Sequence, residues 1–277
     1  MRSLGEILPG CGADVPAGEP VLEVEHVQLR FGGVHALRGV SFDVRQDELF
    51  AVIGPNGAGK SSMFNCLTSV YRPQAGSIRF LGRELTRETP AQVARAGIAR
   101  TFQNIALFDT LTVLDNLLLG RHLHIGYGTF AAFLWRGRAR REEQRERAIV
   151  EQIVAFLELE QHVASPVGLL PYGVKKRVEL GRALAMEPKL LLMDEPVAGM
   201  NTEETEDMAR AILDIREELH VPIVLVEHDM ALVMELADRV LVLDFGAPVA
   251  IGTPEEIQRD PNVIRSYLGQ EHEEVAA

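Results

Sequence analysis

Hydrophobic and polar residues alternate in the part of the chain that follows residue 20. An alternation with a period of two predicts strands with one buried face, and Gly32-Gly33 marks a turn between two of them. Residues 49–53 are apolar throughout, as expected of a strand buried on both faces. The chain is therefore predicted to open with antiparallel strands that lead into a core strand. Up to residue 97 the pattern predicts strands at 21–31, 40–44, 49–53 and 77–81 and helices at 61–68 and 90–96.

The spacing of apolar residues becomes helical between residues 98 and 185. It predicts helices in residues 111–119, 149–159 and 174–185. Residues 136–147, which lie between the first two, contain six Arg and three Glu. A solvated helix face with ion pairs four residues apart is the ordinary interpretation, and contact with a membrane surface or a partner is the alternative. We predict a mostly helical subdomain in this region.

Short apolar runs alternate with helices again after residue 186. Strand, helix and strand in succession predict right-handed βαβ units and a parallel sheet. The complete pattern predicts an α/β fold with a mainly parallel core sheet, an antiparallel β subdomain and an inserted α-helical subdomain. The elements predicted in this last region are strands at 189–193, 223–226 and 240–243 and helices at 203–220 and 231–237.

Composition narrows the classes of function. The 277 residues are 47% hydrophobic, and no apolar run approaches the ~18 residues of a membrane span, so we expect any membrane role to be exerted through a partner. The net charge of −12 argues against nucleic acid as a partner, because nucleic-acid binding needs a basic face. Cys11 and Cys66 have no neighbours at metal-ligand spacing, which indicates a reducing compartment. Residues 1–20 lack the apolar core of a signal peptide and are expected to form a loose N-terminal extension.

Residues 54–62 fit the phosphate-binding pattern G-x-x-x-x-G-K-[ST] between a predicted strand and a predicted helix. The glycines allow backbone N–H groups to face a phosphate, and the helix start adds a positive dipole end. Lys60 supplies a charge for the β- and γ-phosphates, and Ser61 supplies a hydroxyl for Mg²⁺. The alternative is a glycine-rich turn that binds nothing, but a Lys-Ser pair at the helix start serves no packing purpose. The predicted nucleotide cradle consists of Gly54, Pro55, Asn56, Gly57, Ala58, Gly59, Lys60, Ser61 and Ser62.

Polar residues follow two of the predicted core strands and one earlier segment. Asp194 ends one apolar run and is a candidate Mg²⁺ ligand, and the adjacent Glu195 is a candidate general base that polarises the attacking water. An Asp-Glu-Pro turn without function is the alternative. His228 ends the next core strand and is a candidate contact for the γ-phosphate, although a lone histidine is commonly structural. Gln103 lies at the junction to the helical region and is a weaker candidate for the Mg²⁺ shell.

The order of these motifs resembles the nucleotide-binding subunit of ATP-binding cassette (ABC) transporters. The resemblance covers roughly residues 20–270 and implies ATP and Mg²⁺ as cofactors, with Lys60, Glu195 and His228 as the catalytic residues. The Mg²⁺ ligands it implies are Ser61, Gln103 and Asp194. It further implies that Phe31 stacks on adenine, that Gln103 and His228 are the Q-loop glutamine and the switch histidine, and that Ala198-Gly199-Met200-Asn201 is the D-loop.

Several segments are similar to the ATP-binding subunits of branched-chain amino-acid importers. These segments are Phe31-Gly32-Gly33, Thr101-Phe102-Gln103-Asn104, the insertion through Trp135-Arg136-Gly137, and the ending from Gly252-Thr253-Pro254 to Tyr267-Leu268-Gly269. The insertion favours the subunit with the longer helical portion of the two in such a system. The lipopolysaccharide-export ATPase is a near relative with a shorter helical portion.

The signature motif of the family is altered in this chain. It usually reads Leu-Ser-Gly-Gly-Gln, and residues 170–174 read Leu-Pro-Tyr-Gly-Val. Pro171 provides neither a hydroxyl nor an N–H at the position of the serine. Tyr172 and Gly173 remain as candidates to face the nucleotide of an opposite subunit. We therefore expect the chain's own phosphate site to be competent and the site that it completes for a partner to be differently built.

The resemblance implies partners and a location. Two ATP-binding subunits, identical or different, enclose two ATP molecules head to tail and drive two transmembrane permease subunits, with an external or periplasmic substrate-binding protein acting indirectly. The chain would lie peripherally at the cytoplasmic face of the inner (plasma) membrane and power import of branched-chain or related amino acids. Residues 104–108 are candidates for the permease contact, and a buried connection is the alternative. The chain itself does not encode the transported substrate.

Other classes of function agree less well with the sequence. Soluble ABC ATPases of repair or translation typically carry two cassettes or large inserts, and a GTPase would need an Asn-Lys-x-Asp motif, which the chain lacks. ATPase subunits of urea, amide or lipopolysaccharide-export systems are closer alternatives, and Pro171 motivates a non-hydrolysing cassette.

The predicted organisation is an N-terminal extension at 1–20, one ABC ATPase domain at 21–270 and a C-terminal tail at 271–277. Within that domain the core comprises residues 21–97 and 186–270, and the helical subdomain spans approximately residues 98–185.

Overall fold

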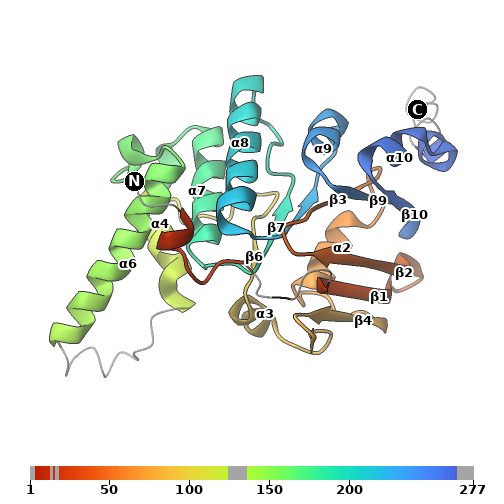
Figure 1. The fold of residues 1–277 in the computed structure, drawn as a ribbon, viewed down its shortest axis with the longest axis horizontal. Helices are drawn as coiled ribbons and strands as arrows, with labels where there is room; N and C mark the ends of the chain where they lie inside the picture. Colours follow the sequence, from red (N-terminus) through yellow and green to blue (C-terminus); the bar gives the residue numbers. More distant parts are fainter. Residues whose placement is uncertain (1–3, 13–14, 16–18, 124–135, 267–277) are drawn as a thin grey trace.

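The computed structural model of the chain describes residues 4–12, 15, 19–123 and 136–266, with the side chains of 123 and 136–140 left aside. The strands of these residues form a four-stranded antiparallel sheet and a six-stranded, mainly parallel sheet (Figure 1). The predicted tail at 271–277 and Trp135 of the insertion lie outside the described residues. In sheet order, the first sheet consists of β2 (Val34–Arg45), β1 (Pro20–Phe31), β4 (Ala75–Phe80) and β5 (Arg83–Glu84). The second consists of β10 (Ala247–Gly252), β9 (Arg239–Asp244), β3 (Leu49–Ile53), β8 (Ile223–Val226), β7 (Leu190–Asp194) and β6 (Ile98–Arg100).

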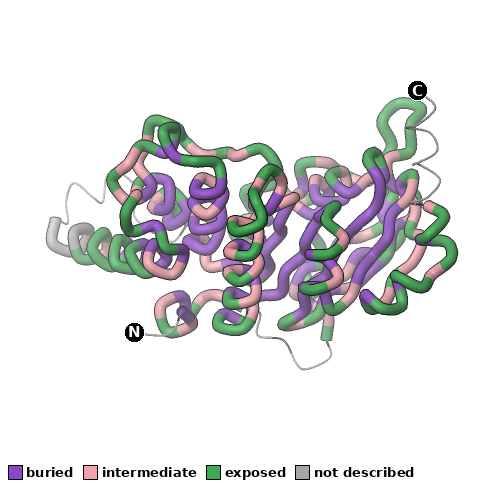
Figure 2. Tube along the Cα trace, turned by 90° about the horizontal axis from the view of Figure 1, so that it is seen from above, coloured by how far each residue is buried: buried purple, intermediate pink, exposed green. Residues whose placement is uncertain are grey.

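The centre of the six-stranded sheet is buried on both faces. Every residue of β3, β7 and β8 is buried, which explains why these strands are unbroken apolar runs in the sequence (Figure 2). All pairings are parallel except that of β9 with β10. Val226 of β8 pairs with Val52 of β3 on one side and with Asp194 of β7 on the other. The carboxyl ends of the three strands therefore meet at one edge of the sheet.

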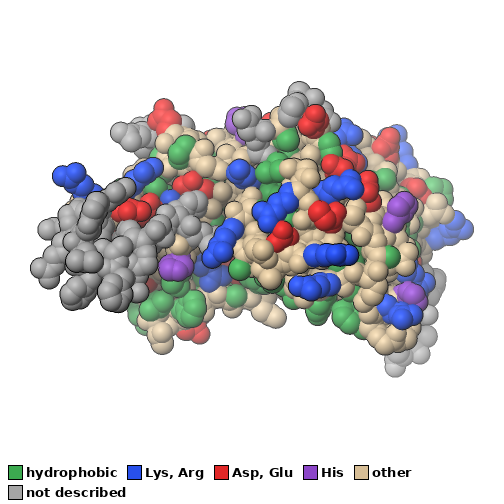
Figure 3. Space-filling model, turned by 90° about the horizontal axis from the view of Figure 1, so that it is seen from below, with side chains coloured by type: hydrophobic (Ala, Val, Ile, Leu, Met, Phe, Trp, Pro, Cys, Tyr) green, Lys and Arg blue, Asp and Glu red, His purple; other side chains and the backbone are tan. Residues whose placement is uncertain are grey.

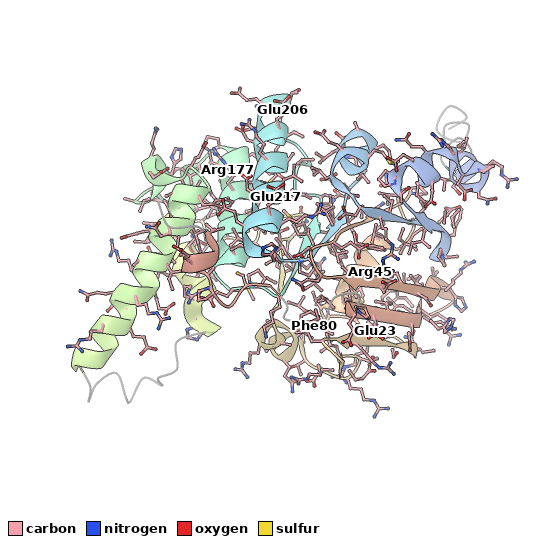
Figure 4. All side chains as sticks on the ribbon, in the orientation of Figure 1. Glu23, Arg45, Phe80, Arg177, Glu206 and Glu217 are labelled. Atoms are coloured by element: carbon pink, nitrogen blue, oxygen red, sulfur yellow. The ribbon has the colours of Figure 1, made fainter. Side chains whose placement is uncertain are left out.

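The antiparallel sheet buries one face and exposes the other. Leu22 of β1 pairs with Val44 on β2 and with Phe80 on β4, and all three side chains are buried. The alternation slips between Val24 and Val27, where the register shifts at a bulge. Figure 4 labels one residue of each kind on this sheet, the buried Phe80 and the partly exposed Glu23. On the face of the molecule seen in Figure 3, acidic and basic side chains are interspersed.

Some helices surround the two sheets, and others make up the helical region. Around the sheets lie α2 (Lys60–Leu67), α3 (Pro90–Ala96), α8 (Thr202–Leu219), α9 (Met230–Leu236) and α10 (Pro254–Arg259). The helical region contains α4 (Val113–Gly120), α6 (Arg136–Phe156) and α7 (Tyr172–Leu184), with short 3-10 turns at Arg121–Leu123, Glu160–His162 and Val167–Leu169. None of the helices in the described part of the chain combines the length and apolar character that a bilayer crossing requires.

Apolar stripes orient these helices. On α8, Met208 and Ile212 are buried, whereas Glu206 and Glu217 are exposed to solvent (Figure 4). A capping box in which Thr112 and Asp115 exchange hydrogen bonds begins α4. The apolar spacing predicted most helices within a few residues of their observed bounds, but α6 begins at Arg136 and not at residue 149, because its charged first half has no apolar stripe.

The charged run of α6 is mostly a solvated face, with one exception. Arg147 and Glu151 form an exposed ion pair four residues apart, as the pattern predicted. Glu146, in contrast, is buried, and its carboxylate accepts a hydrogen bond of 2.5 Å from the guanidinium of Arg121. Arg121 also pairs with Glu187 at 2.8 Å. A buried ionic cluster thus links α6 to the segment that precedes β7.

The structure corrects the predicted boundary of the helical subdomain. Residues 98–100 form β6, in which Ile98 pairs with Leu190 of β7 in the core sheet, so the helical region begins after Arg100. A run of three residues is too short to show a period, which is why the pattern missed it. The pattern also missed β10 and α10.

The prediction of a loose N-terminal extension is wrong for residues 4–12. A short helix, α1 (Leu4–Ile7), lies against α6 and α8 (Figure 1). Leu4 and Leu8 are buried, and the Leu4 N–H donates to the carboxylate of Glu218 on α8 at 2.9 Å. The Gly12 N–H donates to the carbonyl of Pro188 at 3.0 Å. The N-terminal segment therefore joins the helical region to the core.

We expect Leu8→Ala to lower the free energy of unfolding by about 2 kcal/mol or more, because the substitution leaves a cavity at a site that is 1% exposed. Chemical denaturation monitored by circular dichroism measures this change. Leu169→Ala removes the same atoms from a side chain that is 81% exposed and is expected to cost less than about 0.5 kcal/mol. Equal effects of the two substitutions would show that the N-terminal segment contributes no stability.

Candidate nucleotide-binding site

Two glycines of the phosphate loop occupy positions that other residues cannot occupy. Gly54 follows β3 with φ of 148°, and a Cβ atom on it would lie 2.1 Å from the carbonyl oxygen of Leu243. Gly59 precedes α2 with φ of 103°, and a Cβ atom there would lie 2.6 Å from the carbonyl oxygen of Ala36. The loop can therefore pack against β9 and β2 only because these residues lack side chains.

The loop borders an open cleft of about 460 Å³. In α2 the first helical bond runs from the Met63 N–H to the Gly59 carbonyl at 2.9 Å, so the N–H groups of residues 60–62 have no acceptor within the helix. These groups and the positive end of the helix suit an anion such as a phosphate. The cleft is lined by Val34, His35, Ala36, Arg38, Asn56, Gly57, Ala58, Gly59, Lys60, Ser61, Ser62, Gln103, Glu195 and Phe245.

Lys60 extends along the loop toward two backbone carbonyl groups. Its Nζ donates to Gly54 at 2.5 Å and to Pro55 at 3.0 Å, and the residue is 7% exposed. Burial lowers the pKa of Lys60, while the nearby carboxylates of Glu195 and Asp194 act in the opposite direction. The loop thus holds a buried cation at the edge of the cleft.

Glu195 and Gln103 meet at the same cleft. The Gln103 Nε2 donates to the Glu195 carboxylate at 2.8 Å, although the two residues are 92 positions apart. Glu195 has φ of 49°, an uncommon conformation for a residue with a side chain. Its own N–H donates to the Val226 carbonyl at 2.8 Å, which holds it at the end of β7. The structure therefore brings Lys60, Ser61, Gln103 and Glu195 together around one cleft.

Asp194 lies beside this cleft and has a partner that the sequence did not indicate. Its carboxylate forms an ion pair of 2.7 Å with Arg100, and both side chains are buried. The guanidinium also donates to Asn65 and lies over the rings of Phe64 and Phe102. The second carboxylate oxygen of Asp194, Oδ1, is buried without a hydrogen-bond partner. Arg100 precedes a motif residue by three positions, but nothing in its own pattern points to Asp194.

His228 shares the sheet edge with Asp194 but does not line the cleft. Its side chain is 63% exposed, and its ring lies 3.7 Å from the carboxylate of Glu227. Glu227 is fully buried, accepts hydrogen bonds from the N–H groups of Val197 and His228, and has a pKa raised by burial. Glu227 is a second residue that the sequence analysis missed, and it ties the segment after Glu195 to the end of β8.

Phe31, the candidate for adenine stacking, also lies outside the residues that line the cleft. Its ring is 47% exposed and contacts Tyr71 edge-on, with the ring centres 5.0 Å apart. The aromatic residue that does line the cleft is Phe245, which is 70% exposed. Phe245 follows β9 and belongs to no motif that the sequence analysis considered.

The altered signature segment leads into α7, and none of residues 170–174 is among those that line the cleft. Pro171 is the N-cap and makes no side-chain capping bond. Tyr172 is exposed, and Gly173 is buried against the carboxylate of Glu204, where a Cβ atom would lie 2.3 Å from Oε1. A side chain at position 173 would therefore displace the flexible carboxylate of Glu204 on α8.

The strand–loop–helix cradle at the edge of a parallel sheet, with carboxylates at the ends of neighbouring strands, defines a P-loop nucleotide-binding protein. A family model for "ABC transporter" matches residues 37–198, and one for "Branched-chain amino acid ATP-binding cassette transporter" matches residues 248–273. The chain belongs to the ABC transporter family and is an ATP-binding and ATP-hydrolysing subunit of that family.

Similar proteins cover nearly the whole chain. The high-affinity branched-chain amino acid transport ATP-binding protein BraF of Pseudomonas aeruginosa is 42% identical over 91% of this chain and 98% of its own length. The corresponding protein LivG of Salmonella typhimurium is 40% identical over 91% of this chain and 99% of its own length. A solved nucleotide-free ATP-binding cassette from an ABC transporter is 30% identical, with a TM-score of 0.78, and the match covers 90% of this chain and 99% of that one.

We expect Arg100→Met to lower the free energy of unfolding by about 3–5 kcal/mol, because it leaves the buried carboxylate of Asp194 without its partner. Adding Asp194→Asn to the same variant is expected to recover part of the loss, since no charge then remains unpaired. Arg210→Met is the control, because Arg210 forms an exposed pair with Asp207 that is worth less than about 1 kcal/mol. Denaturation curves of the unmodified chain and the three variants measure these effects. A cost for Arg100→Met no greater than that of the control would contradict the buried pairing of Arg100 with Asp194.

Proposed function

We propose that ATP binds in this cleft and that Glu195 acts as the general base for attack of water on the γ-phosphate. The observation that carries the proposal is the convergence of Lys60, Gln103 and Glu195 on the cleft bordered by the phosphate loop. Lys60 and the N–H groups of residues 60–62 stabilise the charge that develops on the transferred phosphoryl group. His228 is proposed to contact the γ-phosphate from the same sheet edge.

The adenine is proposed to stack on Phe31. The exposed ring of Phe31 is supported from one side by Tyr71, which leaves apolar surface for a base. Stacking on a ring requires no hydrogen bonds to the edge of the base. Phe245, at the cleft itself, is a further apolar surface beside the bound nucleotide.

The donor atoms near the phosphate loop also fit Mg²⁺, which prefers oxygen ligands. Ser61 lines the cleft with a hydroxyl, Gln103 with an amide, and the Oδ1 atom of Asp194 is buried without a partner. We assign these three residues to the ion, directly or through water. When bound, the ion neutralises charge on the phosphate oxygens. Arg100 holds the other oxygen of Asp194 and thereby orients the carboxylate.

The working unit is proposed to be a dimer of ATP-binding subunits, identical or different. Tyr172 and Gly173 do not line the cleft of their own chain, which supports their use in the site of a second subunit. Pro171 places no hydroxyl at the start of α7, so recognition there depends on backbone N–H groups and on Gly173. Two unlike subunits would accommodate this difference between the two sites.

We further propose that the dimer powers import of branched-chain or related amino acids through two transmembrane permease subunits. The names of the similar proteins and the family match at residues 248–273 support this substrate class. The chain is proposed to lie at the cytoplasmic face of the inner (plasma) membrane as a peripheral subunit, with an external or periplasmic binding protein delivering the substrate. Residues 104–108, of which Phe108 is exposed, are candidates for the permease contact.

Glu195→Gln is expected to lower the rate of ATP hydrolysis about 100-fold or more while nucleotide binding is retained, because the amide cannot accept the proton of water. Lys60→Ala is expected to lose binding, since it removes the cation of the cradle. Phosphate release and binding of a fluorescent ATP analogue, with and without a second ATP-binding subunit, separate these effects. Unchanged hydrolysis by Glu195→Gln would overturn the role of Glu195. No hydrolysis by the unmodified chain under either condition would favour a non-hydrolysing cassette.

Vesicles are assembled with the permease subunits in the membrane, this chain, a second ATP-binding subunit and ATP inside, and the binding protein outside. They are expected to accumulate radiolabelled leucine. Unlabelled isoleucine and valine are expected to compete, and urea is not. The same vesicles with Lys60→Ala are the control and are expected to accumulate none. Accumulation of urea or an aromatic acid without leucine would transfer the proposal to a different substrate class.

A further inference from the structure

Lys176 is a buried cation that the roles assigned above leave unexplained. It lies on the second turn of α7 and is 3% exposed. Its Nζ donates to the carbonyl oxygens of Gln103 at 3.0 Å, Phe102 at 3.3 Å and Glu195 at 3.4 Å. An ammonium group has three donors, so all of them are used. The three acceptors belong to two segments that are far apart in the sequence and that both border the cleft.

Glu179 lies three residues further along α7 and binds the same loop from the same helix. Its carboxylate accepts hydrogen bonds from the N–H groups of Phe102 and Ala106, both at 3.3 Å. Both backbone groups of Phe102 are therefore bound by α7: its N–H donates to Glu179, and its carbonyl accepts from Lys176. Burial raises the pKa of Glu179 and lowers that of Lys176.

Lys176 contacts the backbones of Gln103 and Glu195, the two residues whose side chains meet at the cleft. These two side chains are hydrogen-bonded to each other at 2.8 Å, and Lys176 binds the backbone carbonyl of each residue. A displacement of either backbone would alter the hydrogen bond and move the carboxylate relative to the cleft. The adjacent Lys175 shows that the arrangement is specific to one position, since it is only half-buried and donates to the Gly168 carbonyl instead.

A role restricted to packing does not account for this arrangement. Burial of an ammonium group costs several kcal/mol unless its donors are satisfied, and an apolar side chain would fill the same volume without that cost. The carbonyl groups of Gln103 and Glu195, in contrast, require donors at this position if they are to be held close together. The function of the lysine is thus best explained by the residues that it binds.

We propose that Lys176 is a positioning residue for ATP hydrolysis, which fixes Gln103 and Glu195 relative to each other and to α7. This inference rests on the proposed role of Glu195. Lys176 touches neither nucleotide nor water in this scheme and acts through the two residues that it holds. Because α7 begins at Tyr172, within the altered signature segment, the same helix also sets the geometry of the chain's own cleft.

The test is a double-mutant cycle between Lys176→Met and Glu195→Gln. Methionine is similar in size to lysine and cannot donate, so Lys176→Met is expected to lower kcat about 10-fold or more, with the dissociation constant of a fluorescent ATP analogue changed less than about threefold. In the Glu195→Gln background the same substitution is expected to have no further effect on hydrolysis, because the group that it positions is already absent. Lys176→Arg retains donors and is expected to recover part of kcat.

Lys189→Met is the matched control, since Lys189 is an exposed lysine that precedes β7 at the end remote from Asp194. It is expected to keep the kcat of the unmodified chain. A kcat for Lys176→Met equal to that of the control, or effects of Lys176→Met and Glu195→Gln that multiply fully, would overturn the inference. If Lys176→Met does not fold, Lys176→Gln takes its place in the same cycle; its two donors cannot satisfy three carbonyl groups, so a smaller loss of kcat that disappears in the Glu195→Gln background is expected. Loss of hydrolysis on Glu195→Gln together with normal hydrolysis by Lys176→Met would reject this inference and leave the proposed function intact.

Discussion

The charges buried at the carboxyl edge of the six-stranded sheet are the constraint on which the rest of the structure depends. Lys60, Asp194, Lys176 and Glu227 are each less than a tenth exposed, and all lie at or beside this edge. A charge removed from water is costly unless it is paired or fully hydrogen-bonded. The partners come from other segments: Arg100 from β6, and backbone groups from the loops after β3, β6 and β7. The loops of the site are held in place by the charges that they surround.

This constraint also joins the helical region to the core. Lys176 and Glu179 on α7 bind the connection at residues 102–106, and this connection leads from β6 into the helical region. A second link lies on the far side, where the N-terminal segment packs Leu4 and Leu8 against both α6 and α8. Both links attach the helical region to the core, and one of them lies at the nucleotide cleft itself.

Most of the core sheet could be predicted from local pattern. The strands β3, β7 and β8 are continuous apolar runs because both of their faces are buried, and their bounds were predicted within a residue. The phosphate loop was predictable because its chemistry is carried by nine consecutive residues, 54–62. The short strand β6 and the helix α1 were not, because three or four residues show no period.

The sequence by itself determined the cradle at residues 54–62, the carboxylates after β7 and the class of chemistry that they serve. Tertiary structure alone decided which residues meet: Arg100 pairs with Asp194, 94 positions away, and Lys176 bridges Gln103 and Glu195. The physical reason is that sequence patterns report on neighbouring residues, whereas contacts in the fold join residues that are far apart along the chain. Periodicity and contiguous motifs are local, whereas the partner of a buried charge is whichever group the fold brings within hydrogen-bond distance.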